Sequence, residues 1–160
     1  MLTLLALLLA ASPLKGENLS DGPFTLAWTA VQACANSGAR FERAAERLTA
    51  DGWTSAERRW VKSDKGPAIS VELAEITGAH APNATMCTVS SPDVEPKRAL
   101  KAFVNLVGKA NYKGDTGDRS ANWRVRINDH PYFASVRPNL SGGIGSSISL
   151  ISIPKVEEVK

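Results

Sequence analysis

Three segments of the chain space their apolar residues like amphipathic helices. Asp21 can cap the first of them, and Pro23 fits its first turn. The second covers residues 39–50, and Gly52 behind it suits the left-handed conformation that ends many helices. The third ends near Gly108. The three apolar stripes consist of Phe24, Ala27, Trp28, Val31 and Ala35, of Phe41, Ala44, Ala45 and Leu48, and of Leu100, Phe103, Val104 and Val107.

Other segments alternate apolar and polar residues, which is typical of strands with one buried face. Turn signals such as Lys65-Gly66-Pro67 separate neighbouring segments, and such short connections favour antiparallel pairing. The polar segment 109–120, which contains Gly114 and Gly117, is expected to be a loop, and 128–131 a turn. The predicted strands are 58–63, 69–74 and 84–90 before the third helix, and 123–128, 132–137 and 146–153 after it.

The order of elements is therefore α-α-β-β-β-α-β-β-β, which predicts an α+β fold. We expect the helices to pack on one face of an antiparallel sheet. The two α-βββ halves show no residue-level similarity, so they do not indicate a repeat. The predicted core consists of Trp28, Val31, Phe41, Leu48, Ile69, Val71, Leu73, Val89, Leu100, Val104, Val107, Val125, Ile127, Val136, Ile148 and Leu150.

The N-terminus differs in composition from the rest of the chain. Every residue up to Ala11 is apolar except Thr3, and Ala10-Ala11-Ser12 supplies the small residues of a cleavage site. We therefore expect an exported protein, periplasmic or secreted. The expected organisation is a signal peptide over 1–11, a mobile leader over 12–22, a single α+β domain over 23–154 and a charged tail over 155–160.

Two other interpretations of the first residues remain open, namely a membrane anchor and a buried first helix. No Lys or Arg precedes the apolar run, which a longer true N-terminal region would explain. A helix of this length covers about 17 Å of a hydrocarbon core of about 30 Å, so an anchor would be too short. No other run approaches the roughly 18 apolar residues that a span needs, so no membrane span is expected in the mature chain.

The chain has two cysteines, Cys34 in the first predicted helix and Cys87 in the third predicted strand. An even pair in an exported chain predicts one disulfide, which would join this helix to the sheet. The alternative is two buried free thiols. There is no Cys-x-x-Cys motif, so a redox-catalytic role is disfavoured.

Candidate catalytic residues are few. The two histidines, His80 and His130, lie in predicted turns without zinc-ligand spacing, so we expect no metal and no cofactor. Residues 139–143 resemble a nucleophile elbow with its first glycine replaced, but a strand rather than a helix follows. Ser141 and His130 are nevertheless the best available candidates for catalysis. A hydrolase that uses them, with Asp129 as the third residue, is the alternative function.

The clearest candidate for binding is a group of arginines. Arg124, Arg126 and Arg137 are predicted on the outward face of the last strands, where they could bind a small anionic ligand or a protein. The alternative is a solvated face, since strands of a one-sided sheet carry polar residues outward. The net charge of +3 is mild and does not indicate nucleic-acid binding.

Several short motifs within 24–105 resemble small, uncharacterised exported proteins of alphaproteobacteria. They are a helix with one cysteine, a helix that ends in Gly52-Trp53, and a strand cysteine followed by Thr88-Val89-Ser90-Ser91-Pro92. The resemblance implies export and a bacterial source, and it indicates nothing about activity. Because the sequence shows few candidate catalytic residues, we expect a non-enzymatic binding or accessory module of the cell envelope.

Overall fold

The computed structural model describes residues 22–38, 40–64, 66–76, 84–107, 112–116, 121–139 and 145–152. The side chains of 41, 106, 107 and 112–116 lie outside this description. The described helices are α1 (Gly22–Asn36), α2 (Phe41–Ala50) and α3 (Pro96–Val107). The described strands are β1 (Thr54–Ala56), β2 (Arg59–Lys62), β3 (Ile69–Ile76), β4 (Ala84–Ser91), β5 (Tyr112–Thr116), β6 (Ala121–Ile127), β7 (His130–Pro138) and β8 (Ser146–Ser152).

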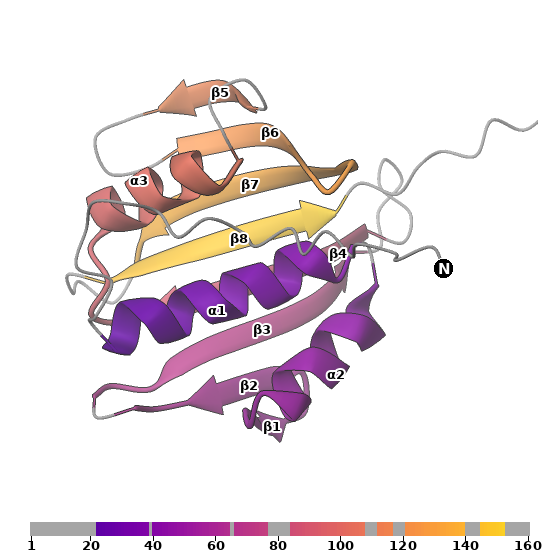
Figure 1. The fold of residues 1–160 in the computed structure, drawn as a ribbon, viewed down its shortest axis with the longest axis vertical. Helices are drawn as coiled ribbons and strands as arrows, with labels where there is room; N and C mark the ends of the chain where they lie inside the picture. Colours follow the sequence, from indigo (N-terminus) through magenta and orange to yellow (C-terminus); the bar gives the residue numbers. More distant parts are fainter. Residues whose placement is uncertain are drawn as a thin grey trace, which may run out of the picture.

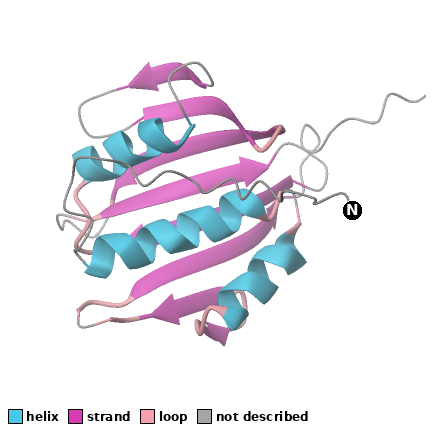
Figure 2. Ribbon diagram, in the orientation of Figure 1, coloured by secondary structure: helices cyan, strands magenta, loops and turns pink. Residues whose placement is uncertain are grey.

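The strands form one eight-stranded sheet in the order β1-β2-β3-β4-β8-β7-β6-β5 (Figure 1). Every neighbouring pair is antiparallel. The last strand, β8, lies between β4 and β7, so it joins the strands that precede α3 to those that follow it. The three described helices all cover the same face of the sheet (Figure 2). The expectation of an α+β fold with helices on one face of an antiparallel sheet is therefore confirmed.

The element order differs from the prediction, because the structure contains two further strands. β1 and β2 form a hairpin whose turn includes Glu57. All three residues of β1 are exposed, and without a buried face this strand has no alternation of apolar and polar residues that would predict it. β5 lies within 109–120, which the sequence predicts to be a loop on account of its glycines and polar residues. Both added strands lie at edges of the sheet, where few apolar residues are needed.

The predicted turn over 128–131 is also too long. Asn128 and Asp129 alone form the connection, and both have positive φ (49° and 61°), as a two-residue type I′ turn requires. His130 and Pro131 already pair with β6 as the first residues of β7. The sequence does not predict this early start of β7, because proline is typical of turns. Proline is nevertheless tolerated at the end of a strand, where Pro131 lies.

Most of the predicted core is correct. Trp28 and Val104 are corrections, because both are only partly buried and pack against the core from its margin. Trp28 stacks on Phe24, with the ring centroids 6.1 Å apart. Large buried aromatic residues outside the prediction include Trp53, Trp60, Trp123 and Tyr132. The predicted core residues that are buried are Val31, Leu48, Ile69, Val71, Leu73, Val89, Leu100, Val125, Ile127, Val136, Ile148 and Leu150, while the side chains of Phe41 and Val107 lie outside the described residues.

Alternating burial along β6 shows how the sheet contacts its helices. Trp123 and Val125 are buried, whereas Arg124 and Arg126 between and beside them are exposed. The ring of Trp123 stacks against Phe103 of α3, with centroids 5.2 Å apart. This stack fixes α3 over the half of the sheet that contains β6.

The predicted left-handed end of α2 is confirmed. Gly52 has a φ of +79°, which glycine adopts without steric cost. The amide of Gly52 donates to the carbonyl of Thr49, and that of Trp53 donates to Leu48. These two bonds form a Schellman motif, and the buried side chains of Leu48 and Trp53 complete it.

Both ends of the chain lie outside the described residues. The expected signal peptide, all of the leader before Gly22, the capping residue Asp21 and the tail over 155–160 therefore stay predictions. Of the described helices, none is long and apolar enough to cross a membrane.

A tight corner fixes the start of β8 against the end of β4. Asn139 donates its backbone N–H to the carbonyl of Gly145 (2.9 Å) and its side-chain amide to the carbonyl of Ser91 (3.0 Å). A Cβ on Gly145 would meet the Ser91 carbonyl oxygen and would lie 2.5 Å from the Pro92 carbonyl oxygen. Backbone atoms cannot move aside as a flexible side chain can, so this position requires glycine.

Replacing Gly145 by alanine should therefore lower the free energy of unfolding by about 1–3 kcal/mol, through forced displacement of backbone in a packed corner. Gly66→Ala is the matched control, because a Cβ there has ordinary contacts, the nearest being Pro23 Cγ at 3.7 Å. Urea denaturation of both variants measures the effect. Equal stability of the two variants would contradict the described corner.

Candidate functional site

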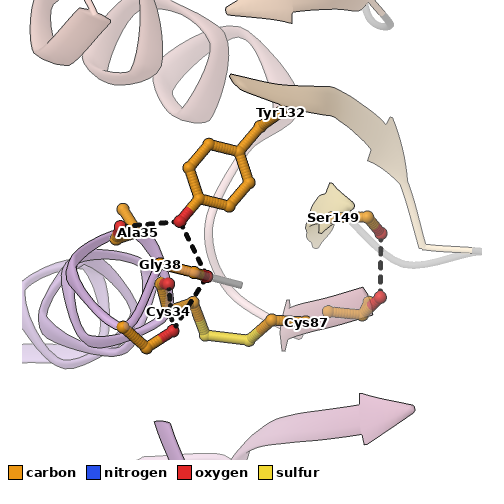
Figure 3. The surroundings of a disulfide bond; sticks show 8 residues. Cys34, Ala35, Gly38, Cys87, Tyr132 and Ser149 are labelled. Carbon is orange, nitrogen blue, oxygen red and sulfur yellow. Dashed lines mark hydrogen bonds between the residues drawn. A yellow bond between two sulfur atoms is a disulfide. The ribbon is translucent and has the colours of Figure 1, made fainter. Parts of the chain in front are cut away.

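The C-terminal end of α1 is covalently joined to the sheet. Cys34 and Cys87 form a disulfide, with their Cα atoms 6.1 Å apart (Figure 3). Both residues are buried. The predicted link from the first helix to the strand that carries Cys87 is therefore present, and the alternative of two free thiols is wrong for this structure.

Hydrogen bonds from other strands attach the same helix end. The hydroxyl of Tyr132, on β7, lies 2.9 Å from the carbonyl oxygens of both Ala35 and Gly38, to which it donates its single proton (Figure 3). The side-chain amide of Asn128, in the β6–β7 turn, donates to Asn36 Oδ1 at 2.9 Å. We call these contacts and the disulfide the α1 anchor. Of these contacts, the bond from Tyr132 to Ala35 occupies a backbone carbonyl that the end of a helix leaves without an intrahelical partner.

The environment of Tyr132 suppresses its ionisation. The residue is buried, and desolvation raises the pKa of its phenol from 10.0 to about 12. His130 packs edge-on against this ring, with centroids 4.9 Å apart. The anchor therefore holds a neutral hydroxyl that acts as a structural donor.

His130 is not the exposed turn residue that the sequence predicts. Because the β6–β7 turn is shorter than expected, His130 lies in β7. It is half-buried, since the His130 ring packs on Tyr132. Asp129, the proposed third residue, is exposed in the turn with a φ of +61°. Ser141 and His80 lie outside the described residues. The hydrolase arrangement with Ser141 stays a prediction that this structure does not test.

The face of the sheet opposite the helices carries no described helix, and we call it the open face (Figure 2). Side chains that alternate with the core residues of β2, β3, β4, β6, β7 and β8 point to it. The strand register arranges them in rows that run across the strands. The open face consists of Arg59, Val61, Ser70, Glu72, Ala74, Met86, Thr88, Ser90, Asn122, Arg124, Arg126, Phe133, Ser135, Arg137, Ser147, Ser149 and Ile151.

The structure places all three predicted arginines on the open face of β6 and β7, and all three are exposed. Arg124 and Arg126 are two residues apart on β6, which is about 7 Å along a strand. Arg137 lies four residues beyond Phe133 on β7, so it is about 13 Å from the row of Arg124. The three therefore form an extended strip rather than a compact cluster.

The partners of these arginines are uncharged groups. The guanidinium carbon of Arg124 lies 5.2 Å from the centroid of the Phe133 ring. Arg137 donates to Asn122 Oδ1 at 3.4 Å, and Arg126 donates to the backbone carbonyl of Asp129 at 3.2 Å. Neither of the ion pairs found among the described residues involves Arg124, Arg126 or Arg137.

The opposite end of the sheet is electrostatically different. Glu72 of β3 lies in register with Arg59 of β2, and Glu75 lies 3.9 Å from Arg58. Here acidic and basic residues occur together. Positive charge is consequently concentrated over β6 and β7.

Two further components of the open face are not predicted from the sequence. One is an apolar row formed by Ala74, Met86, Ile151 and Phe133, which are consecutive register partners on β3, β4, β8 and β7. Phe133 is 41% exposed and is the exposed large apolar side chain among the described residues. The row ends at Arg124, the register partner of Phe133.

The second missed component is a group of short hydroxyl side chains beside the apolar row. All are half-exposed. Two of them, Thr88 and Ser149, hydrogen-bond across the strands at 2.9 Å (Figure 3). The alternation of serines within 146–152 is a visible signal, but only the register shows which serines are neighbours. This hydroxyl patch consists of Ser70, Thr88, Ser90, Ser135, Ser147 and Ser149.

A groove lies on the helical side, between α1 and α2. It is an open groove of about 440 Å³ whose walls include Asn36, Ser37, Arg43, Glu46 and Arg47. Arg43 and Arg47 border Glu46, so basic and acidic groups are mixed in it. Within the described ranges, no group of three His, Cys, Asp or Glu side chains could hold a metal ion.

No protein-family model matches this chain, and no curated protein or solved structure matches it. The function is therefore inferred from the geometry of the chain itself.

Removal of the disulfide should destabilise the protein by about 4 kcal/mol, because it closes a loop with a sequence separation of 53 in the unfolded chain. The double variant Cys34→Ala/Cys87→Ala and the wild-type protein are compared by urea denaturation, each with and without reductant. Reductant should lower the stability of the wild type alone. Two reactive thiols in unreduced, denatured wild-type protein would contradict the disulfide.

Replacing Tyr132 by phenylalanine should cost about 1–3 kcal/mol of stability, since it keeps the ring but removes the donor for the Ala35 and Gly38 carbonyls. The raised pKa of Tyr132 also makes the free energy of unfolding depend on pH. The unfolded state loses the phenolic proton near pH 10 and the folded state near 12, so this contribution is present below pH 10 and is lost between these values.

The pH dependence distinguishes the contribution of the Tyr132 hydroxyl to stability from other effects of the Tyr132→Phe substitution. Unfolding free energies of wild type and Tyr132→Phe, measured between pH 8 and 12, should converge as the pH rises. A difference that is independent of pH would show that the phenol does not titrate as described.

Proposed function

We propose that this chain is an exported, non-enzymatic binding module that captures an anionic partner through the open face. The observation that carries the proposal is the strip of three exposed arginines with uncharged partners on β6 and β7. Guanidinium groups present several N–H donors in a planar fork that matches carboxylate and phosphate oxygens. A partner with negative charge would supply the charged acceptors that these uncharged partners do not.

The apolar row supports a binding role for the same face. Phe133 and Met86 are of residue types enriched in binding surfaces, and Arg124 adjoins them. Arginine stacked on an aromatic ring keeps its edge N–H groups available for an anion. The row and the arginine strip therefore meet at Arg124 and Phe133, which would form the centre of the contact.

The disulfide supports the proposed location. Disulfides persist mainly in oxidising compartments, and this one is buried within the domain. Together with the apolar N-terminal residues of the sequence, it is the basis for proposing export to the cell envelope or beyond. A partner of the module would accordingly be an envelope or extracellular component.

The proposal predicts that neutralising the arginine strip weakens binding of anionic polymers. The triple variant Arg124→Ala/Arg126→Ala/Arg137→Ala should bind poly-L-glutamate and oligogalacturonate at least roughly tenfold more weakly, because charge-assisted hydrogen bonds are lost. Added salt should weaken wild-type binding through screening. Isothermal titration calorimetry measures both effects.

The matched control removes equal charge from the helical side. Arg40→Ala/Arg43→Ala/Lys97→Ala changes three exposed basic residues that lie away from the open face. This variant should bind like the wild type. Equal weakening by both triple variants, or wild-type protein that binds neither polymer, would refute the proposed function.

A further inference from the structure

We infer that the anionic partner is an acidic glycan, a polyhydroxylated chain that carries carboxylates. This inference rests on the proposed binding function and specifies its ligand class. It is carried by the hydroxyl patch, which lies beside the apolar row on the same face and has Arg137 at the end of one of its rows. Charge alone accounts for an anion, whereas the hydroxyl patch adds a requirement for many neutral hydrogen-bonding groups.

The hydroxyl patch is spatially regular. Ser70, Ser90 and Ser147 are consecutive register partners on β3, β4 and β8, and the next partner in this row, on β7, is Arg137. A parallel row passes through Thr88, Ser149 and Ser135 on β4, β8 and β7. Neighbouring strands are about 4.8 Å apart, so the row from Ser70 to Arg137 extends about 14 Å across the strands.

These dimensions suit a chain of linked sugar rings that lies across the strands. Each hydroxyl can donate one hydrogen bond and accept others, as sugar hydroxyls can. Side chains of Ser70, Ser90, Ser135 and Ser147 are short and half-exposed, whereas Met86, Ile151 and Phe133 beside them are longer. The patch is therefore a strip of short side chains with an apolar border along one side.

Two residues at the edges of the hydroxyl patch supply the remaining contacts. Arg137 lies at the end of one row and can bind a carboxylate of the glycan in the bidentate manner. Phe133 presents an exposed ring on the bordering row, and the negative face of an aromatic ring attracts the C–H groups of a sugar. The anionic, polyol and apolar features of one ligand are thus matched by three adjacent groups.

An acidic polypeptide is the competing ligand class, and the composition of the face disfavours it. Serine is depleted in protein–protein interfaces, whereas here five serines lie together on β3, β4, β7 and β8. A peptide contact would engage the apolar row and the arginines, and would leave most of the serine hydroxyls without a role. The two classes consequently differ in their dependence on serine.

The test compares three purified probes of similar length: oligogalacturonate, poly-L-glutamate and a neutral oligogalactose. Binding is measured by calorimetry for the full protein and for the variant Ser90→Ala/Ser135→Ala/Ser147→Ala. The variant should bind oligogalacturonate about tenfold more weakly and should bind poly-L-glutamate unchanged. Wild-type protein should bind oligogalacturonate most tightly and the neutral glycan weakly.

The control variant Thr25→Ala/Thr29→Ala/Ser55→Ala removes three exposed hydroxyls that lie off the open face and should bind like the wild type. Thermal unfolding establishes that each variant is folded. If poly-L-glutamate binds as tightly as oligogalacturonate and the serine variant binds both like wild type, the glycan inference is wrong and the anion-binding function stands. If wild-type protein binds neither anionic polymer, both proposals are wrong.

Discussion

The attachment of the C-terminal end of α1 is the interaction on which the rest of the fold depends. The disulfide to Cys87 holds it to β4, and the hydroxyl of Tyr132 holds it to β7. β8 lies between these two strands, so the anchor spans the position where the two halves of the chain meet. Backbone pairing of β8 with both neighbours makes the sheet continuous, and the anchor fixes one helix end to both halves of it. Burial of the disulfide and of Tyr132 keeps this connection away from water.

One consequence is that the two faces of the sheet have different roles. The helices bury the apolar side chains of one face, including the Phe103–Trp123 stack. The other face is not needed for the core, so its composition is free to serve binding. There the positive charge over β6 and β7 contrasts with the mixed charges near Glu72. This segregation of charge along one surface is the physical basis for proposing that the open face binds the partner.

The sequence predicts those features that depend on local periodicity. Alternation of Ile69, Val71 and Leu73 with polar residues identifies a half-buried strand. A similar alternation on β6 places Arg124 and Arg126 on one face of the sheet. It does not predict β1 or β5, because edge strands need little apolar surface. It also does not predict that β8 lies between β4 and β7, since such pairing depends on distant segments. For that reason the row from Ser70 to Arg137 emerges only from the register.

The arginine side chains offer the most direct measurement of the central claim, namely that the open face binds the ligand. Nuclear magnetic resonance detects each arginine Nε–Hε group separately, so it distinguishes Arg124, Arg126 and Arg137 from the arginines of α2. During titration with oligogalacturonate, the three signals from β6 and β7 should shift and saturate together while those of Arg43 and Arg47 stay in place. Shifts confined to Arg43 and Arg47 would place the ligand in the α1–α2 groove and contradict the account.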